Sequence, residues 1–415
     1  MRALLHPSAP LLAACLAVAL AAAGAASGGD PTPPVPSEVR ALWVARTSLT
    51  SPRAVAEMVE SARGAGFNTL LVQVRGRGDA YFVEGMEPRA AALASQPESF
   101  DPLAHVLALA RPKKLRVHAW ITVNLVSSAS DLPASREHVV YRHPEWLMVP
   151  REIARDMSLL NPKSVLYLDK LARWIRSQPT EVEGLYLSPI PPGSADRTVQ
   201  VIADLVTRYP IDGLHLDYIR YPNAEFDYSR ESLEAFRDDR LEKLDARERA
   251  RRERAAGKDL VAWAEADPAE WQAFRHARLT RLVSRIAASL RARRPGALLS
   301  AAVYPDPDRA AEERLQDWGG WVDRRLLDVV CPMAYATDTG AFTTQISAAR
   351  RGARDFPVWA GIGAYRLSSE QTVENIRIAR RLGASGVVLF SYDSLVSSPQ
   401  GPGYLSQVSR AVFDR

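Results

Sequence analysis

The stretch Ile211-Asp212-Gly213-Leu214-His215-Leu216-Asp217-Tyr218-Ile219-Arg220-Tyr221-Pro222 contains both a strand pattern and a candidate reactive group. Its apolar side chains follow one another almost without interruption, which is typical of a parallel strand covered on both faces. A helical pattern over residues 195–209 precedes it, and Pro210 ends that helix just before the strand. The segment therefore predicts one unit of a parallel β/α repeat.

Strands of the same type recur along the chain. Nearly continuous apolar runs occupy residues 39–46, 68–76, 116–125, 213–220, 297–305, 327–335, 357–365 and 386–393. Amphipathic helical patterns separate most of them, at residues 53–64, 102–113, 195–209, 271–293, 316–325 and 372–382. Eight such units predict a closed (β/α)8 TIM barrel of the α/β class, in a single domain. A ninth apolar stretch at 184–188 is assigned to a long excursion after the third strand, and an open sheet is the alternative.

The composition is that of an ordinary globular chain. Of 415 residues, 47% are hydrophobic and 24% are charged, with a formal net charge of +5. Acidic and basic residues are mixed along the chain, so the weak positive charge does not favour nucleic acid as a partner. The sequence contains no zinc-type Cys/His spacing, phosphate loop or dinucleotide glycine fingerprint. We therefore expect no metal and no organic cofactor.

The N-terminal residues differ from the rest of the chain. Arg2 is followed by an apolar run over residues 11–23 and by small residues through position 29. This order predicts a secretory signal peptide over residues 1–28, since the apolar run is shorter than a membrane span requires. A Pro-rich linker would then cover 29–37 and the barrel 38–415. We expect export to the periplasm or cell surface, with no transmembrane span in the mature chain.

Lipidation is the alternative route of processing. Leu12-Ala13-Ala14-Cys15 resembles a lipoprotein box, but the apolar run continues beyond Cys15, where a lipoprotein signal should become polar. We therefore favour a cleaved signal peptide and keep a lipid anchor at Cys15 as the alternative.

Residues 230–258 are densely charged. Glutamate and aspartate side chains interrupt the arginines, as in Arg247-Glu248-Arg249-Ala250-Arg251-Arg252-Glu253-Arg254. The pattern predicts a solvated helical insertion after the fourth strand and argues against a nucleic-acid-binding arm.

In a barrel of this type the active site lies at the C-terminal ends of the strands. Aromatic, amide and guanidinium side chains predominate there, and Arg46 ends the first strand. Aromatic rings stack on the C–H faces of sugars and polar groups bind hydroxyls, so this lining predicts a polysaccharide substrate. The expected substrate-binding residues are Trp43, Gln73, Arg75, His118, Trp120, Asn124, Tyr218, Arg220, Tyr304, Tyr335, Tyr365 and Tyr392.

Asp217 is the expected catalytic carboxylate. Strand alternation places it on the same face as His215 and nearest the mouth, and a carboxylate rarely occurs in an apolar strand without a partner or a function. A core ion pair with Arg220 or Arg75 is the alternative. Either arginine would also hold Asp217 ionised, which suits a base or nucleophile better than an acid.

Glycosidic cleavage usually needs two carboxyl groups. Glu87, in the loop after the second strand, is the first choice for the second, ahead of Asp79, Asp306 and Asp393. His118 is interpreted either as a general base or as a core histidine. The seventh strand carries no acid, which argues against barrels that place their acids on strands four and seven.

Over residues 38–395 the chain resembles the glycosyl-hydrolase-like family 10 barrels. The motifs that carry the resemblance are Arg40-Ala41-Leu42-Trp43-Val44, Gly66-Phe67-Asn68-Thr69-Leu70, Phe100-Asp101-Pro102-Leu103, His118-Ala119-Trp120, His143-Pro144-Glu145-Trp146, the stretch from Asp212 to Pro222, Asp328-Val329-Val330-Cys331-Pro332-Met333-Ala334-Tyr335 and Phe390-Ser391-Tyr392. The resemblance implies a hydrolase that cuts the glycan strands of peptidoglycan, in its best-known member strands already stripped of peptides. It also supports Asp217 as a motif residue.

The chain departs from the family pattern in two places. Glu87-Pro88-Arg89-Ala90 replaces a Pro-Trp-Ser element, and the insertion at residues 230–258 is longer and more charged than expected. We predict an exported glycoside hydrolase of a cell-envelope polysaccharide. The alternatives are a non-catalytic glycan-binding barrel and a hydrolase of a plant or exopolysaccharide glycan. Bond specificity, anomeric outcome and oligomeric state stay open.

Overall fold

The structure is a computed structural model that describes residues 37–397 and 403–413. The predicted signal peptide at residues 1–28, the alternative lipidation site at Cys15 and all but the last residue of the predicted linker lie outside these residues. Among the described helices, none combines the length and apolar character needed to cross a membrane.

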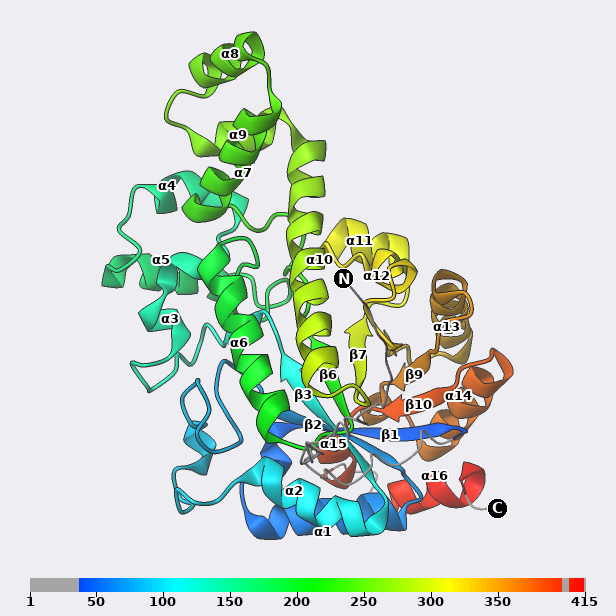
Figure 1. Cartoon of the computed structure of the whole chain (residues 1–415). Coiled ribbons are helices and arrows are strands. Elements are labelled where there is room, and N and C mark those ends of the chain that lie inside the picture. The colour runs from blue at the N-terminus through cyan, green and yellow to red at the C-terminus, as the bar shows by residue number, and fades with distance from the viewer. Residues whose placement is uncertain (1–36, 398–402, 414–415) are drawn as a thin grey trace, which may run out of the picture. The chain divides into compact units, whose positions relative to one another are not determined.

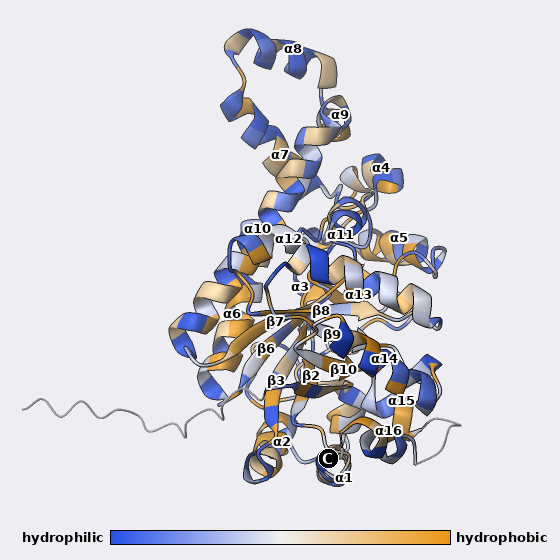
Figure 2. Cartoon of the chain, turned by 90° about the vertical axis from the view of Figure 1, so that its right-hand side faces the viewer, coloured by the Kyte–Doolittle hydropathy of each residue, from blue (hydrophilic) through white to orange (hydrophobic). Residues whose placement is uncertain are grey.

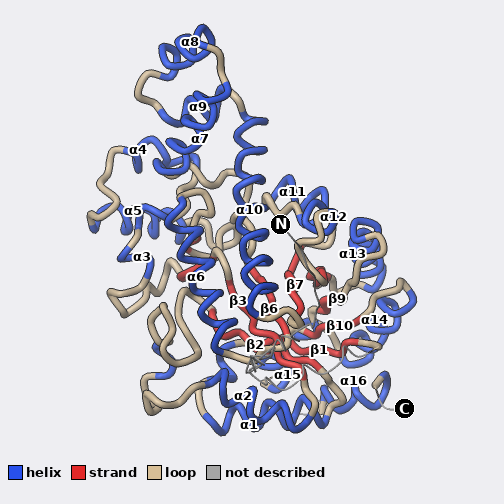
Figure 3. Tube along the Cα trace, viewed as in Figure 1, coloured by secondary structure: helices blue, strands red, loops and turns tan. Residues whose placement is uncertain are grey.

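Eight parallel strands close into a barrel in the order β1-β10-β9-β8-β7-β6-β3-β2. Figure 3 shows these strands gathered together with helices outside them. The strands are β1 (Val39–Val44), β2 (Thr69–Arg75), β3 (Arg116–Thr122), β6 (Gly213–Asp217), β7 (Leu298–Val303), β8 (Val329–Ala334), β9 (Trp359–Ile362) and β10 (Gly386–Leu389). Each lies within one of the eight predicted runs, so the (β/α)8 prediction is confirmed.

The strands are buried on both sides, which explains why their sequences are continuously apolar. Along β1, Leu42 and Val44 belong to the hydrophobic layer between strands and helices. Ala41 and Trp43 belong to a separate cluster inside the barrel. Successive side chains of a strand point to opposite faces, so both sets must be apolar.

The register of β6 sets the position of the reactive groups. This strand lies between β3 and β7, where Asp217 is opposite Thr122, and His215 is opposite both Trp120 and Ser300. Because the strands are parallel, their C-terminal residues meet at one end of the barrel.

Helices that match the predicted patterns surround the strands (Figure 1). They are α1 (Pro52–Gly64), α2 (Pro102–Ala110), α6 (Pro192–Arg208), α10 (Pro268–Arg293), α12 (Trp318–Asp323) and α14 (Ser369–Arg381). Proline at the first helical position and a side-chain cap explain how well some starts were predicted. Ser51 accepts a hydrogen bond from Ala54 N, and Asp101 accepts one from Ala104 N.

Further short elements complete the outer layer. The helices α11 (Pro307–Arg314), α13 (Thr339–Ala353), α15 (Tyr392–Val396) and α16 (Tyr404–Val412) were not predicted. Helix α13 contains several threonines and glycines, which have poor helix propensity, and this weakened its pattern. The 3-10 helices are η1 (Arg46–Leu49), η2 (Ala91–Leu93), η3 (Arg111–Lys113), η4 (Pro144–Trp146), η5 (Arg151–Ile153) and η6 (Ala364–Arg366).

A long excursion follows the third barrel strand. It contains α3 (Val139–Arg142), α4 (Ala154–Ser158) and α5 (Val165–Arg176), and it is bounded by β4 (Leu125–Ser127) and β5 (Leu185–Tyr186). These two strands pair antiparallel in a separate sheet. The ninth apolar stretch thus lies outside the barrel, and the barrel is closed.

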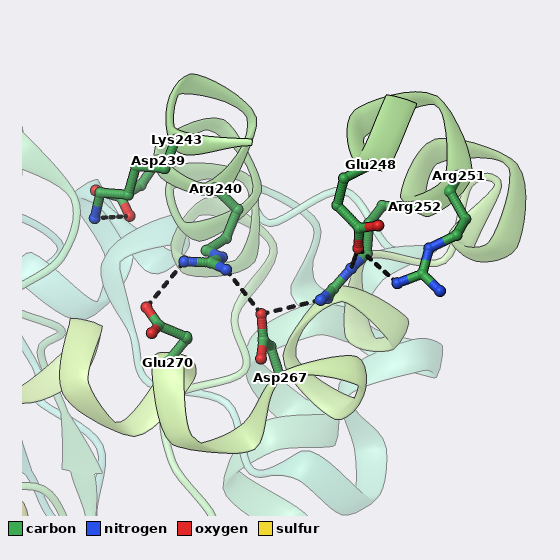
Figure 4. A network of polar contacts seen from close by, with 8 residues as sticks. All are labelled: Asp239, Arg240, Lys243, Glu248, Arg251, Arg252, Asp267 and Glu270. Atoms are coloured by element: carbon green, nitrogen blue, oxygen red, sulfur yellow. Dashed lines mark hydrogen bonds and ion pairs between the residues drawn. The ribbon is translucent and has the colours of Figure 1, made fainter. Parts of the chain in front are cut away.

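The densely charged segment after β6 forms α7 (Arg230–Lys243) and α8 (Ala246–Ala256) and continues into α9 (Leu260–Ala266) and the start of α10. We call residues 230–270 the helical arm. Helix α8 has no buried residue, and its surface is largely hydrophilic (Figure 2). The arm is held by a network of ion pairs (Figure 4). In it Arg240 donates to Asp267 and Glu270, both at 2.9 Å.

Candidate active site

A pocket of about 370 Å3 lies at the C-terminal ends of the barrel strands. This volume falls in the range of roughly 300–1,000 Å3 that is typical of small-ligand sites. Aromatic and cationic side chains dominate its lining. The lining consists of Trp43, Ala45, Arg46, Gln73, Arg77, Trp120, Asp217, Tyr218, Arg220, Ala302, Tyr304, Met333, Tyr335 and Phe390.

Asp217 ends β6, and its side chain is almost completely enclosed. Its Oδ1 accepts a hydrogen bond from Tyr218 N at 2.7 Å, and its Oδ2 accepts one from Trp120 Nε1 at 3.1 Å. Burial raises the pKa of the Asp217 carboxyl, and this effect outweighs the opposing influence of Arg220 and of the two hydrogen bonds. A raised pKa favours the protonated carboxyl, which is able to donate a proton.

The residue after Asp217 has an unusual backbone conformation. Tyr218 has a φ of 49°, in the left-handed region that bulky side chains rarely occupy. The turn directs the Tyr218 N–H back to the carboxyl group and brings the Tyr218 ring into the pocket lining. Strain of this kind is found where a site depends on a fixed geometry.

Arg220 supports the rings beside Asp217. Its Nη2 donates to Glu183 Oε1 at 2.7 Å, and its guanidinium lies 4.5 Å from the ring centroid of Tyr218 and 5.5 Å from that of Tyr304. Arg220 is thus paired with Glu183. Among the described residues no ion pair joins Asp217 to an arginine. The charge of Arg220 still favours the ionised Asp217 carboxyl, as expected from the sequence, but burial outweighs it.

The buried side chain of His215 holds the Trp43 ring in place. Trp43 Nε1 donates to His215 Nε2 at 3.0 Å, and His215 Nδ1 lies 2.9 Å from Ser300 Oγ. Burial lowers the pKa of His215 to about 3, so the ring is neutral. Since Nε2 accepts, the proton lies on Nδ1 and is donated to Ser300. A Cβ on Gly361 would lie 2.8 Å from the Trp43 ring, so glycine at this position makes room for the indole.

An aromatic cluster forms the apolar part of the lining. The Phe390 ring centroid lies 5.9 Å from Trp43, 6.3 Å from Trp120 and 5.5 Å from Tyr335. These rings come from different strands and meet at the barrel mouth. Their faces provide the apolar surface on which the C–H face of a sugar stacks.

The model of the family described as Glycosyl hydrolase-like 10 matches residues 38–362. The chain belongs to this family. It is 23% identical over 202 residues to glycosyl hydrolase YngK of Bacillus subtilis, which covers 45% of this chain and 34% of YngK. It is 24% identical over 300 residues to glycosyl hydrolase DigH of Escherichia coli K12, which covers 68% of this chain and 58% of DigH. The chain therefore spans less than two thirds of the length of either relative.

Several solved structures share the barrel fold of this chain. The PgaB (BpsB) glycoside hydrolase domain of Bordetella bronchiseptica has a TM-score of 0.62 at 15% identity and covers 89% of this chain and 99% of the domain. Alpha-L-fucosidase isoenzyme 2 of Paenibacillus thiaminolyticus has a TM-score of 0.58 at 14% identity and covers 90% of this chain and 48% of the fucosidase. At these identities the likeness shows a common fold.

Glu87, the expected second carboxyl, is bound elsewhere. Its two oxygens accept hydrogen bonds from Arg75 Nε and Nη2 at 2.6 Å and 2.7 Å, and both side chains are buried. Arg75 Nη1 also donates to the carbonyls of Thr122 and Val123. Neither Glu87 nor Arg75 belongs to the pocket lining. The structure therefore places Glu87 and Arg75 outside this lining, where their ion pair ties the loop after β2 to β3.

The other carboxyl candidates also lie outside the lining, and each has a structural role. Asp79 accepts from Gly76 N and Arg77 N, and Asp306 caps α11 by accepting from Asp308 N and Arg309 N. Asp393 accepts from Ala45 N, Thr47 Oγ1 and Ser48 Oγ. In the described lining of the pocket, Asp217 is the one carboxylate.

Four more expected residues lie outside the lining. His118 is fully buried, neither of its ring nitrogens has a hydrogen-bond partner in the described structure, and burial lowers its pKa well below the usual value. It is a core histidine, packed over Gly213. Asn124 donates to the Arg220 carbonyl, and Tyr392 is buried in α15. Tyr365 lies beyond Tyr335, with its ring edge-on at 6.3 Å.

The pocket also contains residues that the sequence did not single out, chiefly Arg77 and Phe390. Arg77 stands between two glycines in the loop directly after β2, and this position next to a strand end was the available indication for it. Phe390 belongs to a family motif, which was the available indication for it. Within residues 37–397 and 403–413, no group of three or more His, Cys, Asp or Glu side chains is arranged to hold a metal.

Proposed function

We propose that the chain is a glycoside hydrolase of a cell-envelope polysaccharide and that Asp217 is its general acid. The observation that carries the proposal is the enclosed Asp217 carboxyl, with its raised pKa, at the mouth of a barrel and among aromatic rings. Membership of Glycosyl hydrolase-like 10 supports the same reaction class.

In this proposal the protonated Asp217 donates its proton to the glycosidic oxygen as the bond to the anomeric carbon breaks. A raised pKa keeps the proton in place until the transition state, which is the requirement for a general acid. The hydrogen bonds from Trp120 Nε1 and Tyr218 N then stabilise the carboxylate that is left. The role thus differs from the base or nucleophile that the sequence suggested.

Asp217 is the one carboxylate in the described lining. We therefore propose that a water molecule attacks the anomeric carbon, either directly or after a group of the substrate has done so, and that the proton which the water loses restores the protonated Asp217 through solvent. Trp43, Trp120, Tyr335 and Phe390 supply the stacking surface for the sugar ring. Gln73 and Tyr304 offer polar groups to its hydroxyls.

We propose the glycan strands of peptidoglycan as the substrate and the periplasm or cell surface as the place of action. The family motifs, such as those at His143 and Asp217, support the substrate. The apolar N-terminal run over residues 11–23 supports export.

The test is the release of soluble fragments and new reducing ends from purified sacculi and from amidase-stripped strands. We expect Asp217→Asn to lower kcat/KM by about 10²- to 10⁴-fold, the usual contribution of a general acid. Asp306→Asn is the matched control, since asparagine caps a helix as well as aspartate does and Asp306 lies outside the lining.

Equal release by wild type and Asp217→Asn would remove Asp217 from the mechanism. Retention of strands by the wild type without any release would identify the non-catalytic glycan-binding barrel instead. Release of fragments only from another polysaccharide would support the proposed reaction and reject peptidoglycan as the substrate.

A further inference from the structure

The pocket contains more positive charge than its own acidic groups balance. Arg46, Arg77 and Arg220 all belong to the lining together with Asp217. Arg220 is neutralised by Glu183 at 2.7 Å. Asp217 is buried with a raised pKa, which disfavours its charged form. Even with Asp217 counted as charged, the guanidinium groups of Arg46 and Arg77 leave the pocket with a net positive charge.

Within residues 37–397 and 403–413, neither Arg46 nor Arg77 forms an ion pair. Arg46 donates weakly to Gln73 Oε1 from its backbone N and its Nη1, at 3.3 Å and 3.4 Å, and lies beside Tyr81. Arg77 Nη1 donates to the Gly76 carbonyl at 3.3 Å. Both side chains are only partly exposed. Desolvating a charge without a partner is costly, so the arrangement favours an anionic ligand.

The two groups are also close enough to repel each other. Burial lowers the pKa of the Arg77 guanidinium and the charge of Arg46 lowers it further, and the opposing effects of Tyr218, Tyr186 and Asp217 do not compensate for this. An anion between the two would relieve both effects. Arginine is suited to this task because its planar group binds a carboxylate through two parallel hydrogen bonds.

The local backbone is built to hold both arginines at the mouth. Arg46 crosses Gly76, where an added Cβ would lie 2.6 Å from Arg46 Cδ. Arg77 is the next residue, and Asp79 Oδ1 accepts from its backbone N at 2.8 Å. His138 Nε2 lies 2.7 Å from the Arg77 carbonyl, and Gly78 follows with a φ of 67°. These contacts fix the backbone of Arg77 and leave its side chain to the pocket.

We infer that Arg46 and Arg77 bind a carboxylate carried by the substrate sugar, so that this chain acts on acidic glycans. The inference rests on the proposed function and adds the residues that recognise the charge of the substrate. Two sugars supply the chemistry: a muramic acid, through its lactyl ether carboxylate, and a uronic acid, through its ring carboxylate. A carboxylate bound here would also favour the protonated state of Asp217, the form that donates the proton.

Binding to the Asp217→Asn protein tests the inference apart from turnover. Calorimetry would compare peptide-free peptidoglycan oligosaccharides with the same oligosaccharides after their carboxyls are converted to neutral methylamides. Chitooligosaccharides and oligouronates of equal length complete the set. We expect amidation to weaken binding by about 10- to 100-fold, as for a lost hydrogen bond to a charged group. Higher salt should reduce the same difference.

Adding Arg77→Gln or Arg46→Gln to this protein should weaken binding of the free carboxylate to a similar extent and leave the methylamide unaffected. Arg77→Lys, which keeps the charge, should restore part of the loss. The matched control is Arg63→Gln, an exposed position at the end of α1. Circular dichroism would show that each variant is folded.

Equal affinity for carboxylate and methylamide, or no binding of any acidic glycan, would overturn the inference. An equal loss for both ligands in Arg77→Gln would do the same. If the wild type cleaved chitooligosaccharides as fast as it cleaves acidic strands, the inference would be rejected and the proposed function would stand. Arg77-dependent binding without cleavage would reject the function and keep the inference. Preference for oligouronates would identify the uronate as the source.

Discussion

The helical arm and the pocket both contain several arginines, and the two regions differ in what these arginines contact. In the arm, Arg240 bonds Asp267 and Glu270, and Arg252 bonds Glu248 at 2.9 Å and Asp267 at 3.2 Å (Figure 4). In the pocket, Arg46 and Arg77 have no carboxylate partner among the described residues.

Arginine side chains thus have two roles in this protein, one in holding the fold together and one at the pocket. Arm arginines join α7 and α8 to the start of α10, which compensates for the small apolar surface of that segment. The buried pair of Arg75 and Glu87 does the same for the loop after β2. An arginine that is half buried and unpaired stabilises nothing by itself, so its position at the mouth indicates a ligand.

Breaking the buried pair should have the largest effect on stability. Glu87→Gln leaves the Arg75 charge enclosed without a partner, which typically costs about 3–5 kcal/mol. We expect Tm to fall by roughly 6 °C or more, measured by calorimetry, because 1 kcal/mol corresponds to about 2–4 °C in a domain of moderate size. Asp217→Asn should not lower Tm. A normal Tm with activity abolished in Glu87→Gln would restore Glu87 as a catalyst.

Removing an ion pair of the helical arm should reduce stability less, and only within the arm. Arg240→Gln removes two partly buried ion pairs, and we expect a loss of about 1 kcal/mol that is confined to the arm. Hydrogen exchange should rise in residues 230–270 while kcat/KM stays unchanged. Arg251→Gln is the control, since Arg251 is 70% exposed and its pair with Glu248 should contribute little. Faster exchange throughout the barrel would contradict a local role for Arg240.

At the base of the arm an acidic residue should make stability depend on pH. Burial, together with the nearby charges of Asp227, Glu234 and Glu145, raises the pKa of Glu231 from an ordinary value of 4.5 to about 7. The folded state then loses stability as pH rises from about 4.5 to 7, and the loss persists above that. We expect Glu231→Gln to raise stability at pH 8 by about 1 kcal/mol, after allowance for solvent screening, and to have little effect at pH 4.5. Thermal melts at both pH values test the sign, and an equal shift at both would exclude titration as the cause.

Removing the unpaired charge of Arg77 should change stability least. Arg77→Met removes an unpaired charge, so we expect the free energy of unfolding to stay the same or to rise by up to about 0.5 kcal/mol. Arg240→Gln should change it in the opposite direction. Chemical denaturation of the two variants side by side is the measurement, and a clear loss in Arg77→Met would show that this arginine supports the fold.

The barrel and the position of Asp217 could both be predicted from the amino-acid sequence. Burial on both faces makes each barrel strand continuously apolar, a pattern carried by neighbouring residues and therefore visible in one chain. Asp217 ends such a run, and strand ends meet at the mouth in this fold. Aromatic residues at the same ends, such as Trp43 and Trp120, were predicted for the same reason.

The ion pairs, in contrast, could be identified only in the folded structure. Glu87 and Arg75 are twelve positions apart and pair inside the protein, whereas Arg220 pairs with Glu183 from a distant excursion. His118 follows the same strand rule as Trp120 but lies deeper, so it is core. Which charged side chains pair, and how deep a side chain lies in the barrel, depend on how the loops fold back across the strands. The order of residues along the chain does not show this. For this reason the unpaired state of Arg46 and Arg77, on which substrate selection is proposed to depend, emerged only from the folded arrangement.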